Sequence, residues 1–452
     1  MTVVTAVLVT TLQLTVASAN AGSSSAPCTV AARPTNSITV WHALDGPRAK
    51  LLAQIADEFE ATSGIHVTLV DAQGGDTLLQ DWRHNSRRTR PDLALVPQDG
   101  VQLLGDSGTI LGIDKCLDRA TGPDLLPVVR STYTVQGRVW ALPLAVSTPV
   151  LLYNRRVFRD AGLDPDAPPT SPADIRAASA RIVASGAARY GLAFDTGAES
   201  GGSWFVEQWL SQLDRESLSP GNGHQGAARS VTWPDDESVS ALLWLAQLEH
   251  DGLAVDVGPN RAGSDDLLRL GAQHDSAAMV LHTSAALGET LDLVDDGRQP
   301  GVELGVAQLP GPGRGGLVGG SGLVFAAGKP ARAVAASWAF AAYFASPEVQ
   351  SRWSAGSGYL PPSAASTNME PLTTTWTARP QMAVAFTQLA DLPATDARSG
   401  PIAGPMRSIR QQLAAATSRA VDGINVRRAL LDAARAANSL LRDYDTATAA
   451  RR

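Results

Sequence analysis

The chain has 452 residues, enough for one large two-lobed unit or for two to three domains, and 44% of them are hydrophobic, as in a globular protein with a sizeable core. Charged residues make up 18% and the formal net charge is -7. No basic run or high isoelectric point is present, so the composition argues against a nucleic-acid-binding protein.

The first element is an apolar run from Val3 to Val16, followed by small residues that fit signal-peptidase cleavage at Ala17-Ser18-Ala19 or Ala19-Asn20-Ala21. The run is too short to cross a bilayer comfortably. No Lys or Arg precedes it, which is atypical of a signal, and a buried N-terminal strand or helix is the alternative. We expect a signal peptide at 1–21, a flexible linker at 22–36 and an exported protein.

Cys28 and Cys116 are the two cysteines of the chain. In an exported protein two cysteines usually pair, so a Cys28–Cys116 disulfide is predicted. Cys28 could instead be the acylated cysteine of a lipoprotein, but Pro27 stands where a lipobox has Gly, Ala or Ser. Two free thiols are the remaining alternative.

A strand–helix alternation begins at Ser37. Strands are predicted at 37–41, 65–70 and 92–97, and the last is a continuous apolar run typical of a parallel sheet. Gly46-Pro47 opens a helix between the first two strands. This β-α-β-α-β order indicates an α/β lobe.

Further along, two short strands flank Ser147-Thr148-Pro149, and the chain then becomes mainly helical. A Gly/Pro stretch at 310–322 precedes another strand, and two amphipathic helices are expected between about 405 and 445. The other predicted elements are strands at 140–144, 150–153, 277–281 and 323–325, and helices at 174–186, 203–213, 236–250, 264–272, from 283, at 331–345 and from 347.

Two motifs point to enzymes, and each has a simpler interpretation. Gly105-Asp106-Ser107-Gly108 matches the nucleophile stretch of chymotrypsin-like proteases, but α/β flanks indicate a turn. Gly311–Gly316 satisfies the dinucleotide fingerprint, but a strand follows it where a helix is required. The seven histidines are scattered, so neither a metal nor a cofactor is predicted. A glycan hydrolase would need two carboxylates facing one pocket, and no motif selects a pair.

An ordered set of short stretches resembles the carbohydrate-type substrate-binding proteins of ABC importers, the extracellular solute-binding family 1. Each stretch is weak alone, and their order from about residue 37 to 440 carries the resemblance, which is strongest to the glycerol-3-phosphate-binding branch; an amino-sugar-binding member is also a candidate. The stretches are Ile38-Thr39-Val40-Trp41-His42, Ser147 to Asn154, Phe158, Ala161 to Pro165, Pro168-Pro169-Thr170, Ala278-Met279, Gly319-Gly320-Ser321, Ser346-Pro347-Glu348 and Gly358-Tyr359-Leu360-Pro361.

The resemblance implies an α/β, two-lobed periplasmic-binding-protein fold with a hinge and an interlobe ligand cleft. Lobe 1 is expected to hold residues 37–147 and 285–340, and lobe 2 residues 148–284 and 341–452, with a crossover at Ser147-Thr148-Pro149. By position, it also suggests eight ligand-binding residues: Asp76, Gln98, Ser147, Trp204, Ser284, Gly319, Gly320 and Tyr359.

An aromatic platform with nearby hydroxyls suits a sugar, whose C–H face stacks on a ring while its hydroxyls require hydrogen-bond partners. Several of these residues have structural alternatives. Trp204 and Tyr359 could be core residues, and Ser147 and Ser284 could cap backbone groups. Gly319-Gly320 could let the backbone approach the ligand or could form a turn.

Two departures from the glycerol-3-phosphate branch bear on the ligand. That branch has a phosphate-binding Arg in the segment corresponding to Pro401–Pro405, where this chain has no Arg until Arg407. Asp76 stands where the branch has a Tyr, and Gln98 where it has a Glu. Loss of an anion clamp, with Asp76, Asp99, Asp195 and Glu199 in or near predicted cleft loops, favours a neutral or amine-bearing sugar over a phosphomonoester.

The sequence therefore predicts an exported, monomeric, non-enzymatic protein at the periplasmic or cell-envelope face of the membrane, either free or membrane-anchored. It would capture a small saccharide, with an amino sugar favoured, and deliver it to the permease subunits of an ABC importer. The alternatives are a glycerophosphodiester or glycerol-3-phosphate binding protein, a secreted glycan hydrolase, and a structural surface protein.

Overall fold

The computed structural model describes residues 26–118, 122–197, 201–258, 265–271 and 274–450. The expected signal peptide lies outside these ranges, as does Glu199. Within them, every helix is too short or too polar to cross a membrane.

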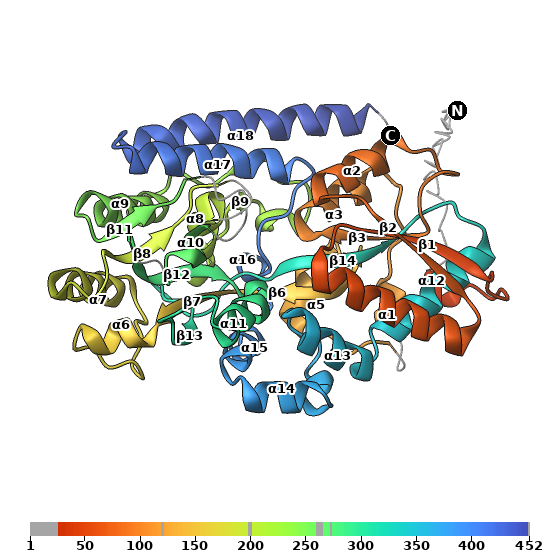
Figure 1. Ribbon diagram of the computed structural model, residues 1–452. Helices are drawn as coiled ribbons and strands as arrows, with labels where there is room; N and C mark the ends of the chain where they lie inside the picture. Colours follow the sequence, from red (N-terminus) through yellow and green to blue (C-terminus); the bar gives the residue numbers. More distant parts are fainter. Residues whose placement is uncertain (1–25, 119–121, 198–200, 259–264, 272–273, 451–452) are drawn as a thin grey trace, which may run out of the picture.

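Two five-stranded sheets, side by side in Figure 1, form two lobes. The first follows the predicted alternation, since apolar residues of each strand pack under helices that the intervening segments form. Its order is β2-β1-β3-β14-β6, with β1 parallel to β2 and β3 and with β14 antiparallel to β3 and β6. The strands are β1 (Ser37–His42), β2 (His66–Asp71), β3 (Leu93–Pro97), β6 (Leu142–Ser147) and β14 (Gly319–Phe325).

Helices of the first lobe bury one apolar face each on this sheet. In the first helix, Leu52, Ile55 and Phe59 recur at helical spacing and are buried, and the helix ends at Gly64 with a left-handed backbone (φ +69°). The lobe contains α1 (Gly46–Ser63), α2 (Gly75–His84), α3 (Gln98–Asp106), α4 (Asp114–Leu117), α12 (Ala331–Phe344), α13 (Pro347–Ser357) and the hairpin of β4 (Thr134–Val135) and β5 (Arg138–Val139).

The second sheet has the order β11-β8-β12-β7-β13. Its central strand β12 pairs parallel to β8 and antiparallel to β7. The strands are β7 (Pro149–Asn154), β8 (Tyr190–Phe194), β11 (Ala254–Asp256), β12 (Ala277–Thr283) and β13 (Leu304–Gln308), and the main helices are α6 (Arg155–Asp160), α7 (Pro172–Ser185), α8 (Gly201–Gln212), α9 (Asp236–His250), α11 (Leu287–Asp295), α14 (Leu372–Ala378) and α15 (Gln381–Ala390).

Shorter elements fill the connections between these layers. The predicted helix at 264–272 is one turn within the described residues, Asp265–Leu268. The remaining elements are η1 (Pro27–Thr29), α5 (Pro127–Thr132), β9 (Leu218–Ser219), η2 (Gly221–Gly223), β10 (Ser230–Val231), α10 (Asp265–Leu268), η3 (Ser284–Ala286), η4 (Ala364–Asn368) and α16 (Asp396–Ser399).

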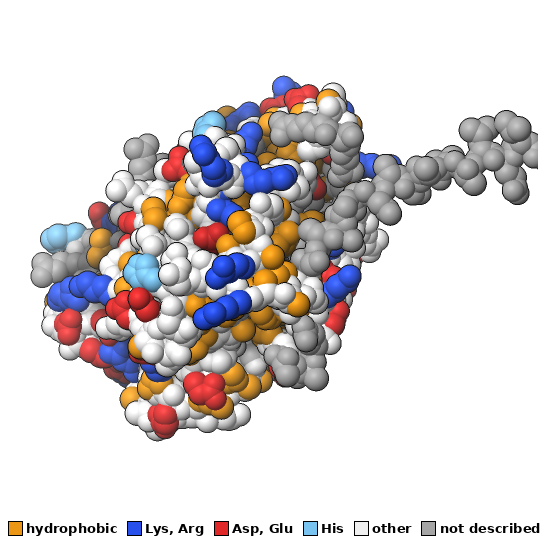
Figure 2. Space-filling view, turned by 90° about the vertical axis from the view of Figure 1, so that its right-hand side faces the viewer, with side chains coloured by type: hydrophobic (Ala, Val, Ile, Leu, Met, Phe, Trp, Pro, Cys, Tyr) orange, Lys and Arg blue, Asp and Glu red, His pale blue; other side chains and the backbone are white. Residues whose placement is uncertain are grey.

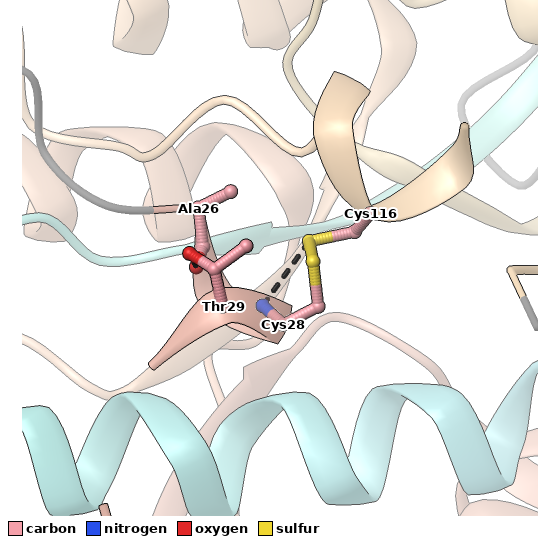
Figure 3. Close-up of a disulfide and its surroundings, with 4 residues drawn as sticks. All are labelled: Ala26, Cys28, Thr29 and Cys116. Atoms are coloured by element: carbon pink, nitrogen blue, oxygen red, sulfur yellow. Dashed lines mark hydrogen bonds between the residues drawn. A yellow bond between two sulfur atoms is a disulfide. The ribbon is translucent and has the colours of Figure 1, made fainter. Parts of the chain in front are cut away.

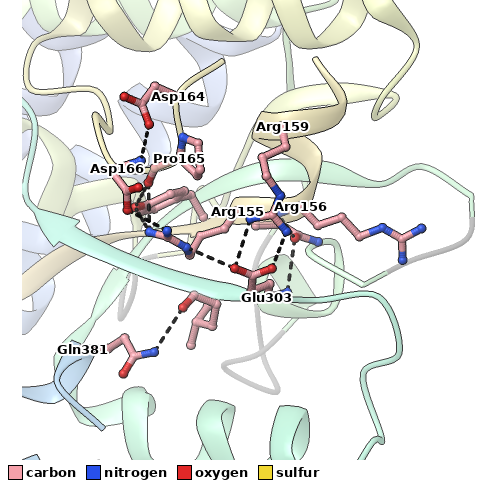
Figure 4. Close-up of polar contacts among 11 residues, drawn as sticks. Arg155, Arg156, Arg159, Asp164, Pro165, Asp166, Glu303 and Gln381 are labelled. Atoms are coloured by element: carbon pink, nitrogen blue, oxygen red, sulfur yellow. Dashed lines mark hydrogen bonds and ion pairs between the residues drawn. The ribbon is translucent and has the colours of Figure 1, made fainter. Parts of the chain in front are cut away.

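The sheets divide the chain differently from the expected boundaries at 285 and 340. Strand β13 pairs with β7, so 304–308 belongs to the second sheet, whereas it was expected in lobe 1. Figure 4 shows one reason: Glu303, just before β13, accepts hydrogen bonds from Arg155 (3.3 Å) and Arg159 (3.1 Å) of α6. Conversely, α12 and α13 both pack in the core of the first lobe, so that core extends past residue 340.

The two C-terminal helices, α17 (Met406–Val421) and α18 (Val426–Ala449), lie across both lobes (Figure 1). Their apolar faces share a core with α8 and α9 of the second lobe, including Val206, Leu242 and Ile409. At the other end, Tyr444 of α18 donates a hydrogen bond to Asp106 of α3 (3.0 Å). The predicted amphipathic helices of the C-terminal segment therefore contact both lobes.

A disulfide joins Cys28 to Cys116, as predicted, with a Cα–Cα distance of 5.5 Å (Figure 3). Cys28 lies in η1 and the buried Cys116 in α4, so the bond ties the start of the described chain to lobe 1. This part of the expected flexible linker is ordered by the bond, which closes a loop across a sequence separation of 88 residues.

Candidate functional site: the interlobe cleft

A cavity of about 430 Å³ lies between the lobes, where β3, β6 and β14 of the first sheet and β7, β8 and β12 of the second come close to each other. This volume is typical of a small-molecule site. Both lobes and α17 contribute to its lining, which consists of Asp76, Pro97, Gln98, Asp99, Ser147, Thr148, Pro149, Asp195, Ser203, Trp204, Leu281, His282, Thr283, Leu317, Val318, Gly319, Gly320, Arg407, Arg410 and Gln411.

Most of the residues predicted to bind ligand converge on this cavity. Asp76 lies in the first turn of α2, Gln98 begins α3, and Ser147 ends β6. Parallel strands followed by helix starts present backbone donors and polar side chains at one crevice. The lining includes Asp76, Gln98, Ser147, Trp204, Gly319 and Gly320, whose contacts with a ligand remain a prediction.

Trp204 reaches the cleft because of a close approach at the start of α8. A Cβ at Gly202 would lie 2.2 Å from the carbonyl oxygen of Thr196, so only glycine allows the helix to start against the loop that follows β8. Trp204 in the first turn is consequently half-buried, with its ring on the cavity side of the lobe.

Gly319 and Gly320 lie in strand β14, whereas the structural alternative considered for them above was a turn. Gly320 has a φ of +107°, and a Cβ there would lie 1.8 Å from the carbonyl oxygen of Ala145 on β6. The glycine is therefore required by strand pairing, whatever its contact with a ligand.

Ser284 and Tyr359 lie outside the cavity lining. The Oγ of Ser284 accepts a hydrogen bond from the Thr148 amide (3.1 Å), and its own amide donates to the Thr148 carbonyl (2.8 Å). Tyr359 stacks on Trp353 with ring centroids 6.1 Å apart, and the guanidinium of Arg48 lies over the Tyr359 ring, 5.4 Å from its centroid. Ser284 thus holds the crossover between the lobes, and Tyr359 packs against the core of lobe 1.

Two arginines that were not assigned to the cleft line it. Arg407 forms an ion pair with Asp76 and lies 3.3 Å from Asp99 through its Nε atom. The expectation that Asp76 receives a ligand amine rested on the absence of a nearby arginine, and this pair removes that basis. The amphipathic pattern between 405 and 445 predicted helices, but it did not indicate that the first turn of α17 would face the cleft.

Arg410 lies one turn further along α17, where a carboxylate on α8 fixes its guanidinium group. Glu207 on α8 is fully buried and accepts three hydrogen bonds from Arg410, two from Nε (3.0 and 3.2 Å) and one from Nη2 (2.8 Å). Burial acts to lower the pKa of Arg410, but the charges of Glu207 and Asp99 outweigh it and raise that pKa. The guanidinium is therefore a fixed positive charge in the cleft wall.

The cavity lining also includes a buried carboxylate from the second sheet. Asp195 follows β8 directly, is only 5% exposed and accepts a hydrogen bond from the Gly197 amide (2.9 Å). Asp256 ends the neighbouring strand β11, and burial raises its pKa, with the charge of Asp195 acting in the same direction. A positive charge placed near Asp195 would relieve this repulsion.

Two lobes, a crossover between adjacent strands and a polar interlobe cavity with one half-buried Trp define a cleft-type solute-binding protein. The sequence profile of the bacterial extracellular solute-binding proteins matches residues 54–384, and the chain belongs to this family. It is therefore a solute-binding protein of the extracytoplasmic type.

Individual relatives differ in what they bind. The sn-glycerol-3-phosphate-binding periplasmic protein UgpB of Yersinia pseudotuberculosis is 23% identical over 389 residues, which cover 82% of this chain and 84% of that protein. The crystal structure of a cyclic alpha-maltosyl-1,6-maltose binding protein from Arthrobacter globiformis has a TM-score of 0.72 and 23% identity, covering 91% of this chain and all 100% of that one. UgpB from Mycobacterium tuberculosis, in complex with glycerophosphocholine, has a TM-score of 0.72 and 19% identity with the same coverage of 91% and 100%.

The buried ion pair in the cleft wall makes a prediction about stability. Glu207→Gln should lower the free energy of unfolding by about 3–5 kcal/mol, because it removes the buried counter-charge of Arg410 and leaves only the longer contact to Asp99 (3.7 Å). Asp76→Asn is the matched control: its carboxylate is 53% exposed, so loss of the pair with Arg407 should cost less than about 1 kcal/mol. Urea denaturation measures both. Equal losses in the two variants would contradict this ranking.

Proposed function

We propose that this protein captures a small saccharide in the interlobe cleft and delivers it unchanged to the permease of an ABC importer, acting as a monomer outside the cytoplasmic membrane. The observation that carries the proposal is the cavity itself: Trp204 offers a face for the sugar ring, and Ser147, Gln98 and the glycine backbone of β14 offer hydrogen-bond partners around it. The family assignment and the sugar-binding structural relatives support it.

A non-catalytic role is supported by how the cleft carboxylates are used. Asp76 and Asp99 are ion-paired with arginines of α17. A retaining or inverting glycan hydrolase requires a protonated carboxylic acid opposite a second carboxylate. Both aspartates instead face guanidinium groups of the same helix, which does not match that arrangement.

An amine-bearing sugar is favoured among saccharides, with Asp195 in place of Asp76 as the partner of the amine. Asp195 is buried, lines the cavity and lies near the half-buried carboxylate of Asp256. A charge-assisted hydrogen bond to an ammonium would be strong in such surroundings. Glycerophosphodiesters are the second candidate class, because Arg407 and Arg410 line the same cavity.

The function is tested by a thermal-shift screen of neutral sugars, amino sugars, glycerol-3-phosphate and glycerophosphocholine. A true ligand at 100 times its Kd should stabilise the protein by about 2.7 kcal/mol. Mass spectrometry after prolonged incubation should recover that ligand intact. Conversion of the ligand would identify a hydrolase, and no stabilisation by any compound would favour a structural surface protein.

Trp204→Ala should weaken binding of the stabilising saccharide by on the order of 1–3 kcal/mol, because it removes stacking area and a rigid wall. Isothermal titration calorimetry measures the change. Tyr359→Phe, a conservative change at a residue that packs outside the cavity, serves as the control and should bind like the unmodified protein. Unchanged affinity in Trp204→Ala would mean that the indole is only a wall of the lobe.

Asp195→Asn should weaken an amino sugar at least about tenfold more than the neutral sugar of the same configuration, because the charge-assisted contact is lost. Asp76→Asn should affect both sugars alike, since Arg407 occupies that carboxylate. Calorimetry with the two sugars separates the cases. Tight binding of glycerol-3-phosphate with inert amino sugars would reverse the assignment and make Arg407 the anion clamp.

A further inference from the structure

The end of lobe 1 farthest from the cleft carries a group of arginines, which we call the basic face. It combines the segment after α2, the turn before α12 and the strand-free segment before β1. Its exposed members are Arg33, Arg83, Arg87, Arg88 and Arg332, and Arg90 and Lys329 lie half-buried between them.

Contacts between these three segments make the face continuous. Lys329 donates a hydrogen bond to the carbonyl of Arg90, and the side chain of Arg87 lies against Gly328. Arg332 donates from Nε to the carbonyl of Arg33 (3.2 Å). The seven cations, which are spread over 300 positions of the sequence, therefore share one surface.

The basic face has few counter-charges of its own. Among the described residues, no carboxylate lies within 4.0 Å of the nitrogen atoms of its exposed arginines; only Lys329 has one, Asp92 at 3.5 Å. Burial lowers the pKa of Arg90, and the charge of Arg87 acts in the same direction, as expected for cations held together without neutralisation.

Three exposed arginines of α18 provide a contrast with the basic face. On α18, Arg427 pairs with Asp236, and Arg428 and Arg435 both pair with Asp432. The basic face is also unlike the chain as a whole, which has a net charge of -7. Figure 2, which looks at this end of the molecule, shows Lys and Arg side chains gathered along the middle of the view. Charge is thus segregated, with a positive end on an acidic protein.

The chain enters the fold at the same end. Residues 27–29 form η1, which packs on α12, the helix that carries Arg332, and the Cys28–Cys116 bond fixes them there. Twenty-five residues of sequence precede Ala26, the first described residue, and they include the apolar run Val3–Val16. The sequence that precedes Ala26 therefore joins lobe 1 beside the basic face.

We propose that the basic face binds the anionic lipid headgroups of the membrane at which the protein works. Guanidinium groups bind phosphate oxygens through paired hydrogen bonds, and clusters of four to eight basic residues are typical of surfaces that bind acidic lipids. The arginines come from three separate segments and form an array, so they suit a surface carrying many phosphates better than one small anion. Such binding would hold the protein near its permease independently of the ligand cleft.

The proposal is tested by co-sedimentation of the exported protein with vesicles. Binding to vesicles of about 30% phosphatidylglycerol in phosphatidylcholine should exceed binding to pure phosphatidylcholine at least about tenfold, and should fall as NaCl is raised from about 0.05 to 0.3 M. The triple variant Arg83→Gln, Arg87→Gln, Arg88→Gln should lose at least about tenfold of this binding.

The matched control is Arg427→Gln, Arg428→Gln, Arg435→Gln on α18, which changes the net charge equally at arginines that have acidic partners. This variant should bind vesicles like the unmodified protein. An unchanged midpoint of thermal unfolding in both variants, measured without any ligand, verifies their folding and keeps this test separate from the proposed function.

Three outcomes would overturn the proposal. Equal binding to neutral and anionic vesicles would assign binding to apolar insertion. Equal loss in the two triple variants would assign it to net charge. Binding to soluble polyphosphate without binding to vesicles would identify an anionic polymer, and not a lipid surface, as the partner.

Discussion

Thr148 is the one residue between two strands that belong to different sheets, and its fixed geometry is the constraint on which the two-lobed arrangement depends. β6 ends at Ser147 and β7 begins at Pro149, so the chain leaves one lobe and enters the other within three residues. The Thr148 amide donates a hydrogen bond to Ser284, and the Thr148 carbonyl accepts one from the Ser284 amide. The Oγ1 atom of Thr148 accepts a third hydrogen bond from Gln388 (3.1 Å). A crossover this short places Ser147 and Pro149 in the cavity lining by connectivity alone.

The second determinant is the pairing of arginines with carboxylates in the cleft. Arg410 and Glu207 both belong to the second lobe, with a partner contact to Asp99 of α3 at 3.7 Å. Their bidentate bond lies within one lobe, so it persists if the lobes separate, whereas the contacts to Asp76 and Asp99 connect α17 to lobe 1. Ion pairs between lobes that are partly exposed contribute little free energy, which leaves the relative position of the lobes free to respond to a ligand.

The local part of this structure could be predicted from the sequence, and the long-range part could not. Alternating or continuous apolar runs predicted β1, β3 and the apolar half of β14. Of the eight ligand-binding residues that the family resemblance suggested, six line the cavity. The glycine half of β14 has no apolar signal, and β13 belongs to lobe 2 through contacts such as that of Glu303 with Asn154, 149 positions away. Arg407 was missed for the same reason, since its place depends on how α17 packs on α8.

The charge distribution links these observations. Each arginine in the cleft is paired with carboxylates of the protein, and this pairing determines how it can interact with a ligand. Glu207 neutralises Arg410 and fixes its orientation, so the group can donate hydrogen bonds without attracting a free phosphate as an isolated cation would. Arg407 is likewise balanced by Asp76 and Asp99. Beside the cavity, burial raises the pKa of Asp256, and the charge of Asp195 acts in the same direction. A neutral sugar could bind such a cleft through its hydroxyls, whereas a ligand with a positive group near Asp195 would also gain a charge-assisted hydrogen bond, which is the physical argument behind the amine proposed above.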